Sequence, residues 1–228
     1  MKIPPPDVPD LPSARPTMAT LFPHSDTWPE YELVDIGERR KLERFGSVLV
    51  DRPEPQALWR KHAPPGVWEA ADMSFNASDD QDAGAWQVKR GLPREWAIQF
   101  EKVTAICRTT SFRHVGVFPE QSYHWRWIVR QVEKSSRPPS ILNLFGYTGI
   151  VSLLAAAAGA TVTHVDASKK AIAWARENQE RSGLSQAPIR WICDDASRPR
   201  KRRVDEQPAV NCFSGLIPLE FREKLVRL

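Results

Sequence analysis

The pattern of hydrophobic and polar positions divides the chain into successive stretches. Residues 1–29 hold eight prolines and few aliphatic pairs, which predicts a disordered or extended leader. Residues 30–120 favour a small β-rich α+β domain, because short runs of β-branched and aromatic residues alternate with polar ones. The strands expected there, antiparallel to one another, cover residues 31–36, 47–50, 86–88, 97–107 and 112–118.

From residue 121 onwards, helical and strand periodicity alternate. Ile141–Phe145 is a short apolar run between a proline pair and Gly146, which is typical of a buried strand. The elements predicted in order are a helix over 122–134, the strand at 141–145, an alanine-rich helix over 150–158, a strand at 161–165, a helix between Ser168 and Gly183, and a strand at 189–193. This order predicts an α/β domain over 121–196 with a parallel sheet and right-handed crossovers.

The turn after the first strand of this domain is the strongest candidate for a binding site. Gly146 and Gly149 stand at the strand-to-helix turn, and Asp166 ends the next strand, 20 residues after Gly146. An acid there can accept hydrogen bonds from both hydroxyls of a ribose, and Asp195, after the third strand, would meet an adenine amine. The glycines follow G-x-x-G and not G-x-G-x-x-G. The pattern therefore favours an adenosine ligand without a pyrophosphate, for which S-adenosylmethionine is the common example.

Composition limits the alternatives. Hydrophobic residues make up 41% and charged residues 26% of the 228 positions, as in ordinary globular proteins. The three cysteines form no C-x-x-C pair and the five histidines are scattered, so we predict neither a disulfide framework nor a metal site, and a cytoplasmic location. No apolar run approaches the roughly 20 residues that span a membrane.

The net charge of +4 comes from residues 141–228, since the acids and bases of residues 1–140 balance. Five basic residues fall within Arg198–Arg203. Such a run can neutralise the phosphates of RNA, and a solvated loop is the alternative reading.

Three segments together resemble class I S-adenosylmethionine-dependent methyltransferases. They are LNLFGYTG at 142–149, THVDAS at 163–168 and AWAREN at 173–178, with HVGVFPEQ at 114–121 preceding them. Within that class, residues 31–196 look most like the bacterial group related to the large-subunit ribosomal RNA cytosine-C5 methyltransferases. The resemblance implies a Rossmann-like fold, S-adenosylmethionine as cofactor and RNA as partner. In such a protein we expect residues 30–120 on the substrate side.

By the same resemblance, residues 145–149 would wrap the methionine end of the cofactor, and Gln121 would help to close the site. The candidate cofactor-binding residues are Asn143, Phe145, Gly146, Tyr147, Thr148, Gly149, Asp166, Ala167, Ser168, Asp195 and Gln121. No catalytic residue is predicted, because neither Cys193, expected inside a strand, nor Cys212 has a setting that would make it a nucleophile.

The chain departs from this class after Ala196. No Asp-Pro-Pro motif follows, and residues 197–228 read as a basic, atypical tail without further strands. We therefore expect a truncated, incomplete parallel sheet in which 141–145 is an uncovered edge, open to self-association and without catalytic competence. Two other readings stay open: a nucleotide-dependent oxidoreductase, which the missing glycines disfavour, and a non-catalytic fragment or scaffold that binds S-adenosylmethionine or RNA.

Overall fold

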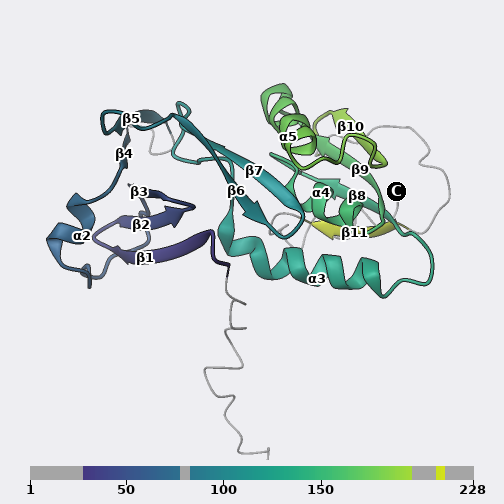
Figure 1. Ribbon diagram of the computed structural model, residues 1–228, viewed down its shortest axis with the longest axis horizontal. Coiled ribbons are helices and arrows are strands. Elements are labelled where there is room, and N and C mark those ends of the chain that lie inside the picture. Colours follow the sequence, from purple (N-terminus) through teal and green to yellow (C-terminus); the bar gives the residue numbers. More distant parts are fainter. Residues whose placement is uncertain (1–27, 78–82, 197–208, 214–228) are drawn as a thin grey trace, which may run out of the picture.

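The computed structural model describes residues 28–77, 83–196 and 209–213. These residues form two lobes, with a β hairpin that reaches from one to the other (Figure 1). The basic run at 198–203 and most of the proline-rich leader lie outside the described residues. Among the residues described, no helix is long and apolar enough to cross a membrane, and no group of three metal-binding side chains occurs.

The N-terminal lobe is a five-stranded sheet in the order β1-β2-β3-β4-β5. Its elements are β1 (Tyr31–Gly37), β2 (Arg40–Phe45), β3 (Val48–Pro53), the short helix α2 (Pro65–Glu69), β4 (Met73–Ala77) and β5 (Gly84–Val88). The expectation of a purely antiparallel sheet is wrong at one place, because β3 and β4 pair in parallel. The long connection that contains α2 returns the chain to the end of the sheet at which β3 begins, so that β4 can run parallel to β3.

A hairpin of β6 (Glu95–Phe100) and β7 (Val103–Arg108) follows, where the sequence predicts one strand over 97–107. The turn lies at Glu101, which has a φ of 51° without being glycine, so no glycine or proline marks it. Residues 112–118 do not form the predicted strand. They run as an extended linker with a left-handed turn at Gly116 (φ 103°), and they lead into the second lobe.

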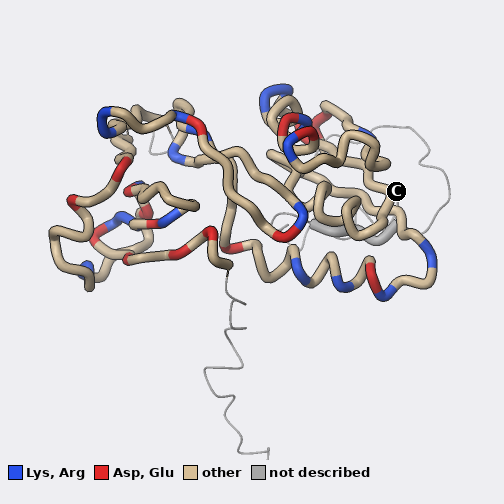
Figure 2. Tube along the Cα trace, viewed as in Figure 1, with Lys and Arg blue, Asp and Glu red and all other residues tan. Residues whose placement is uncertain are grey.

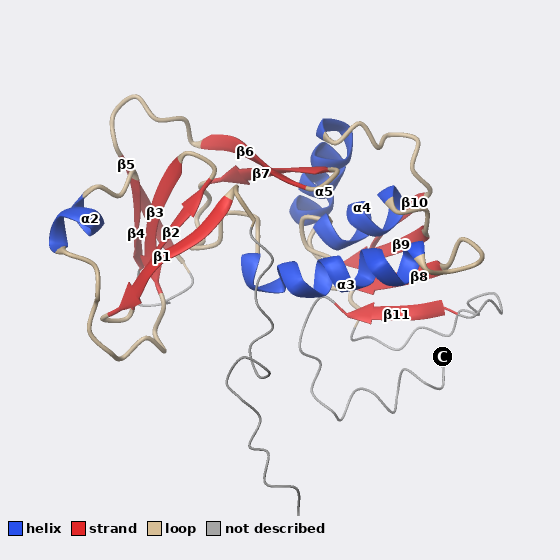
Figure 3. Ribbon diagram, turned by 60° about the horizontal axis from the view of Figure 1, so that its bottom comes forward, coloured by secondary structure: helices blue, strands red, loops and turns tan. Residues whose placement is uncertain are grey.

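The second lobe is an α/β layer built on a parallel sheet. Its elements are the 3-10 turn η1 (Pro119–Gln121), α3 (Ser122–Glu133), β8 (Ser140–Leu144), α4 (Ile150–Ala157), β9 (Thr161–Asp166), α5 (Lys169–Arg181), β10 (Ile189–Cys193) and β11 (Ala209–Phe213). All neighbouring strands are parallel in the order β10-β9-β8-β11, which confirms the predicted α/β class. Leu153 and Ala155 of α4 are fully buried against the sheet, and α3 packs against α4 (Figure 3).

The strand β11 corrects the expectation that the sheet stops at its third strand. Ala209–Phe213 pairs in parallel with β8 along its whole length, from Ser140 to Leu144. The apolar strand β8 is therefore covered on both sides, by β9 and by β11. The uncovered edge that was expected to drive self-association is absent, and the segment after Ala196 does contribute an element to the fold.

The predicted leader also extends too far, because Trp28 belongs to the core. Its indole N–H donates to the carbonyl of Gln99 at 2.7 Å, and its ring packs edge-on against Phe100 and Trp125. These contacts join the first described residues to the hairpin and to α3. Aromatic packing of this kind stabilises beyond the area buried.

Candidate cofactor site

The turn between β8 and α4 is held in an unusual backbone conformation. Phe145 and Tyr147 have φ angles of 56° and 49°, and Gly149 has a φ of 82°. A left-handed conformation at a residue other than glycine costs of order 1–3 kcal/mol, and such residues persist where the surroundings determine the conformation and cluster at ligand sites. The turn is therefore shaped by its contacts and not by the local preference of its sequence.

The two glycines of the turn are required by packing against the protein. A Cβ atom on Gly146 would lie 2.2 Å from the His164 ring, and one on Gly149 would lie 2.8 Å from the Ala175 Cβ. The sequence pattern suggests that glycines let a ligand approach the backbone. In the structure their missing side chains let the turn lie directly on β9 and α5, which brings its remaining backbone to the edge of the sheet.

Beneath the turn lies a buried network of neutral polar groups. The Asn143 amide donates to the Ser152 hydroxyl at 2.9 Å, and that hydroxyl lies 3.0 Å from His164 Nδ1. Burial lowers the pKa of His164 to about 4, so its ring is neutral at physiological pH. Asn143, a predicted cofactor-binding residue, thus directs its side chain into the interior, where it supports the turn from below.

Asp166 ends β9 with its carboxylate fixed by two backbone groups. The N–H groups of Tyr147 and Ser168 each donate to one of its oxygens at 2.8 Å. An ionised carboxylate offers about four acceptor positions, so two remain for the hydroxyls of a ribose. The contact to Tyr147 also ties the acid directly to the glycine turn, as the spacing of Gly146 and Asp166 suggests.

The other candidates at this edge are close to Asp166. Ser168 caps α5, since its hydroxyl accepts from the Ala171 N–H at 3.2 Å, and the carbonyl of Ala167 faces the Cys193 thiol. Asp195 follows β10, whose end is joined to β9 because the Asp194 N–H donates to the Asp166 carbonyl at 3.0 Å. The acids after β9 and β10 therefore lie at the same carboxyl edge.

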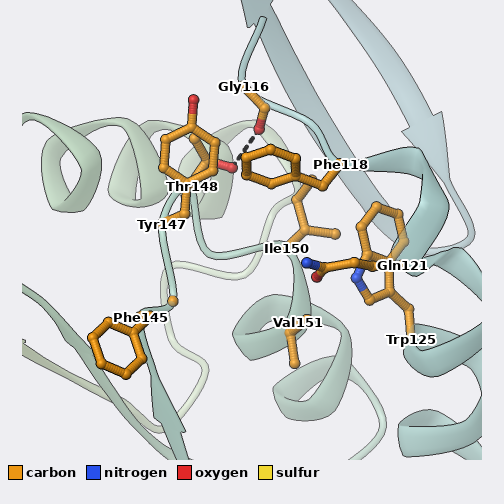
Figure 4. A pocket seen from close by; sticks show the side chains of 10 residues that line it. Gly116, Phe118, Gln121, Trp125, Phe145, Tyr147, Thr148, Ile150 and Val151 are labelled. Atoms are coloured by element: carbon orange, nitrogen blue, oxygen red, sulfur yellow. Dashed lines mark hydrogen bonds between the residues drawn. The ribbon is translucent and has the colours of Figure 1, made fainter. Parts of the chain in front are cut away.

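A small hollow of about 40 Å³ opens beside the turn (Figure 4). Its lining comes from the linker, α3, the turn and the start of α4: Gly116, Phe118, Gln121, Trp125, Phe145, Gly146, Tyr147, Thr148, Ile150 and Val151. Four predicted site residues of the turn and Gln121 meet here: Phe145, Gly146, Tyr147, Thr148 and Gln121. The other predicted site residues do not line this hollow: Asn143, Gly149, Asp166, Ala167, Ser168 and Asp195.

The lining is aromatic and carries no formal charge. The rings of Phe118 and Tyr147 lie 5.2 Å apart, while the exposed ring of Phe145 stands at the other side of the turn (Figure 4). Burial raises the pKa of Tyr147 to about 12, which keeps its hydroxyl protonated. The site therefore presents π faces, which attract a cation such as a sulfonium.

Gly116 and Asn178, which the sequence analysis did not include among the site residues, hold this site together. The Thr148 hydroxyl donates to the carbonyl of Gly116 at 2.6 Å, as the dashed line in Figure 4 marks, so it does not cap α4. A Cβ at Gly116 would lie 2.3 Å from the Trp174 ring. Asn178 of α5 receives the Ile106 N–H and donates to the Thr148 carbonyl, each at 2.9 Å. A glycine inside a predicted strand can mark such a close approach, but nothing in the sequence pairs Asn178 with Ile106.

A second hollow of about 170 Å³ adjoins the first through Phe118, which lines both. Its walls come from β2, β3 and the linker: Lys41, Arg52, Pro53, Glu54, Arg113, His114, Phe118 and Glu120. Basic and acidic side chains thus share this hollow beside the aromatic one, and Lys41 pairs with Glu54 at 3.3 Å. Figure 2 shows the basic and acidic residues of both lobes along the chain.

The parallel sheet, the glycine turn and the acid at the tip of β9 together define the fold of class I S-adenosylmethionine-dependent methyltransferases. A solved S-adenosylmethionine-dependent methyltransferase from Agrobacterium tumefaciens is 53% identical, with a TM-score of 0.72 over 75% of this chain and 55% of its own. A Streptococcus mutans protein described as belonging to the same class is 17% identical, with a TM-score of 0.58, and shows the fold alone. The resemblance seen in the sequence is confirmed.

Curated relatives agree with this class. The ribosomal RNA large subunit methyltransferases K/L of Shewanella baltica and Magnetococcus marinus are 37% and 36% identical over 87 and 104 residues. These matches cover 38% and 45% of this chain, and the chain spans only 12–13% of the length of those relatives. No protein-family model matches the chain.

Proposed function

We propose that the chain forms the cofactor-binding part of an S-adenosylmethionine-dependent methyltransferase that acts on a base of ribosomal RNA. The observation that carries the proposal is the Asp166 carboxylate, held by the backbone of the glycine turn with acceptor positions left for a ribose. The neutral aromatic hollow beside it suits the cationic sulfonium end. The Agrobacterium tumefaciens relative, an S-adenosylmethionine-dependent methyltransferase, supports the same cofactor.

In this proposal the chain's own residues bind and orient the cofactor. Asp166 would hold the ribose, Asp195 would meet the adenine, and the turn from Phe145 to Gly149 would surround the methionyl end, with Gln121 closing the site. S-adenosylmethionine supplies an electrophilic methyl group when it is bound. The burial of Asn143, Ser152 and His164 keeps the turn in its strained conformation before any ligand arrives, which lowers the cost of ordering the site on binding.

RNA as the substrate is supported by the curated relatives, which are ribosomal RNA methyltransferases, and by the second hollow. Lys41, Arg113 and His114 lie there beside the aromatic hollow, where they could contact phosphates. We accordingly assign residues 30–120 to the substrate side and 121–196 to the cofactor. A cytoplasmic location stays part of this proposal, supported by the free thiols of Cys107 and Cys193.

A second candidate function is cofactor or RNA binding without catalysis. It is favoured by the lining of the first hollow, where tyrosine is the only titratable side chain, so that lining offers no thiolate and no general base. The Cys107 thiol is fully buried, and burial raises its pKa far above the usual range. C5 chemistry on a pyrimidine would require both a nucleophile and a base.

The test is calorimetric titration of the purified chain with S-adenosylmethionine. Wild type should bind, and Asp166→Asn and Asp166→Ala should weaken binding at least 10-fold, while the exposed Glu32→Gln should bind like wild type. If the Asp166 variants bind S-adenosylmethionine as tightly as wild type, the proposal is contradicted. Transfer of a labelled methyl group to ribosomal RNA then separates the two candidates, because a binding module would take up the cofactor without transfer.

A substrate-side variant tests the role of RNA. Lys41→Ala should weaken RNA binding uniformly across sequences and reduce the slope of log K against log salt by about 1. Trp127→Phe, on the exposed face of α3, serves as the control for a surface change on the other lobe. If Lys41→Ala leaves the slope of log K against log salt unchanged, the second hollow is not part of the RNA-binding site.

A further inference from the structure

The indole of Trp125 is a buried hydrogen-bond donor without an acceptor in the described part of the chain. The residue is 2% exposed, and no hydrogen bond reaches its Nε1 atom there. The other buried tryptophan N–H groups in the described residues do have acceptors: Trp28 donates to Gln99, Trp68 to Asp35, Trp86 to Phe112 and Trp174 to Ile106. An indole N–H that is buried unpaired costs about 1–3 kcal/mol, and a ligand that supplies an acceptor recovers this cost.

The unpaired N–H belongs to the lining of the aromatic hollow. Trp125 stands one turn into α3, and Figure 4 shows the nitrogen-bearing edge of its ring on the side where Gln121 and Val151 lie. The rest of the ring is fixed, because it packs at 5.1 Å against Phe100 and at 5.8 Å against Trp28. The donor is therefore held in place before any ligand binds.

A second feature of the same hollow favours an anion. The helix α4 begins at Ile150, and its first residues, Ile150 and Val151, line the hollow. No side chain caps this helix, so its first backbone N–H groups and the positive end of its dipole face toward the turn. The hollow has no Lys, Arg or His in its lining, so an anionic group there would be met by neutral donors alone.

We propose that Trp125 is a specificity-determining residue which donates its indole N–H to the carboxylate of the methionyl group of the cofactor. This inference rests on the proposed function, since it assigns one chemical group of that cofactor to one part of the site. The carboxylate is the strong acceptor at the methionyl end. Its neighbouring ammonium and the sulfonium can face the rings of Phe118 and Tyr147 instead.

The experiment compares two ligands that differ only in this carboxylate. S-adenosylmethionine and its decarboxylated form are titrated into wild type, Trp125→Phe and Trp127→Phe, with the thermal transition of each variant recorded. Wild type should bind the decarboxylated ligand about 10- to 100-fold more weakly. Trp125→Phe should lose a similar factor for S-adenosylmethionine and little for the decarboxylated ligand, and Trp127→Phe should match wild type for both.

The outcomes separate this inference from the proposed function. If wild type binds neither ligand, the proposed function fails and the inference falls with it. If wild type binds S-adenosylmethionine but Trp125→Phe weakens both ligands equally or neither, the cofactor assignment stands and the role of Trp125 is overturned, because a purely structural role would not distinguish the ligands.

A measurement on the unaltered chain covers the case in which Trp125→Phe does not fold. In ¹⁵N-labelled wild type, the signals of the nine tryptophan indole N–H groups are followed as each ligand is added. One signal should move downfield with S-adenosylmethionine and stay in place with the decarboxylated form. If no indole signal distinguishes the two ligands, the proposal is wrong.

Discussion

The N-terminal sheet keeps a complete ion pair in its interior, whereas the parallel sheet keeps only neutral polar groups. In the first lobe the Arg52 guanidinium donates to both oxygens of Glu43, and the two side chains are 2% and 1% exposed. Tyr31 donates to the same carboxylate at 3.0 Å. In the second lobe the corresponding interior groups are an amide, a hydroxyl and a neutral imidazole.

The two arrangements respond differently to loss of a partner. Burial alone would raise the pKa of Glu43, but Arg52 outweighs this effect and lowers it, so the pair depends on both charges. In the parallel sheet, Asn143, Ser152 and His164 need no charged partner, because burial lowers the pKa of His164 and keeps its ring neutral. The N-terminal sheet therefore keeps two opposite charges in its interior, whereas the interior of the parallel sheet beneath the turn stays neutral.

The largest expected effect comes from breaking the ion pair on one side only. Arg52→Met should destabilise the fold by about 3–5 kcal/mol, because it leaves the Glu43 charge buried and unpaired. The double substitution Glu43→Met with Arg52→Met should recover most of this loss, since two apolar side chains replace the pair. Equilibrium urea denaturation measures both. If Arg52→Met is no less stable than the double variant, the Glu43 carboxylate is not left buried and charged when Arg52 is removed.

A pH titration is the corresponding test of the neutral network. The pKa of His164 is near 6.5 in the unfolded chain and about 4 in the folded one, so the unfolded state takes up a proton first as pH falls. Stability should be constant above pH 6.5 and fall by roughly 2–3 kcal/mol as pH drops from 6.5 to about 4. His164→Asn should flatten this slope between pH 6.5 and 5, a window above the pH at which the buried carboxylate of Glu43, whose pKa is lowered in the fold, begins to contribute. If the free energy of unfolding of His164→Asn still falls with pH as in wild type, a group other than His164 causes the pH dependence.

Gly146→Ala tests how tightly the turn lies on that network. The added Cβ would approach the His164 ring to 2.2 Å, so we expect a loss of about 1–3 kcal/mol in denaturation experiments. Gly66→Ala is the matched control, because nothing lies within 4 Å of its Cβ and it sits in α2 of the other lobe. Combining Gly146→Ala with His164→Ala should cost less than the two losses added. Simple additivity would argue against direct contact.

The smallest effect concerns the start of α5 beside Asp166. Ser168→Ala removes the hydroxyl that accepts from Ala171 and should cost about 1 kcal/mol. Ser168→Asp keeps a capping oxygen and should retain most of the stability. Thermal unfolding of both variants decides this, and equal losses would mean that the hydroxyl does not act as a cap.

The sequence was most informative where structure depends on neighbours in the chain. The alternation of strands and helices from 121 to 193 predicted the α/β class correctly, and the spacing of Gly146 and Asp166 predicted their proximity, because a β-α-β unit brings these positions to one edge of the sheet. Ser168 was recognisable as a cap because its partner is three residues away.

The errors arose where distant contacts decide the conformation. β11 has a short, unremarkable sequence, and its strand conformation follows from pairing with β8. The left-handed Gly116 is fixed by packing against Trp174 of α5, whose indole donates to Ile106. At the hairpin turn, the carbonyl of Glu101 accepts from the Gln99 amide, and its carboxylate lies 3.7 Å from Arg126 of α3. The unpaired N–H of Trp125 is invisible in a sequence, since only the folded arrangement shows which tryptophans have acceptors.

The pairing of β11 with β8 also has a consequence for folding during translation, because the two strands are synthesised at different times. β8 occupies an inner position of the sheet, yet its second neighbour is encoded near the end of the described residues, after β9 and β10 have been made. Translation at roughly 5–20 residues per second leaves one side of β8 open for several seconds while the intervening helices and strands emerge. During this interval the apolar strand keeps an unpaired edge, the kind of surface that pairs with other chains, and slower codons between β10 and β11 would lengthen its exposure.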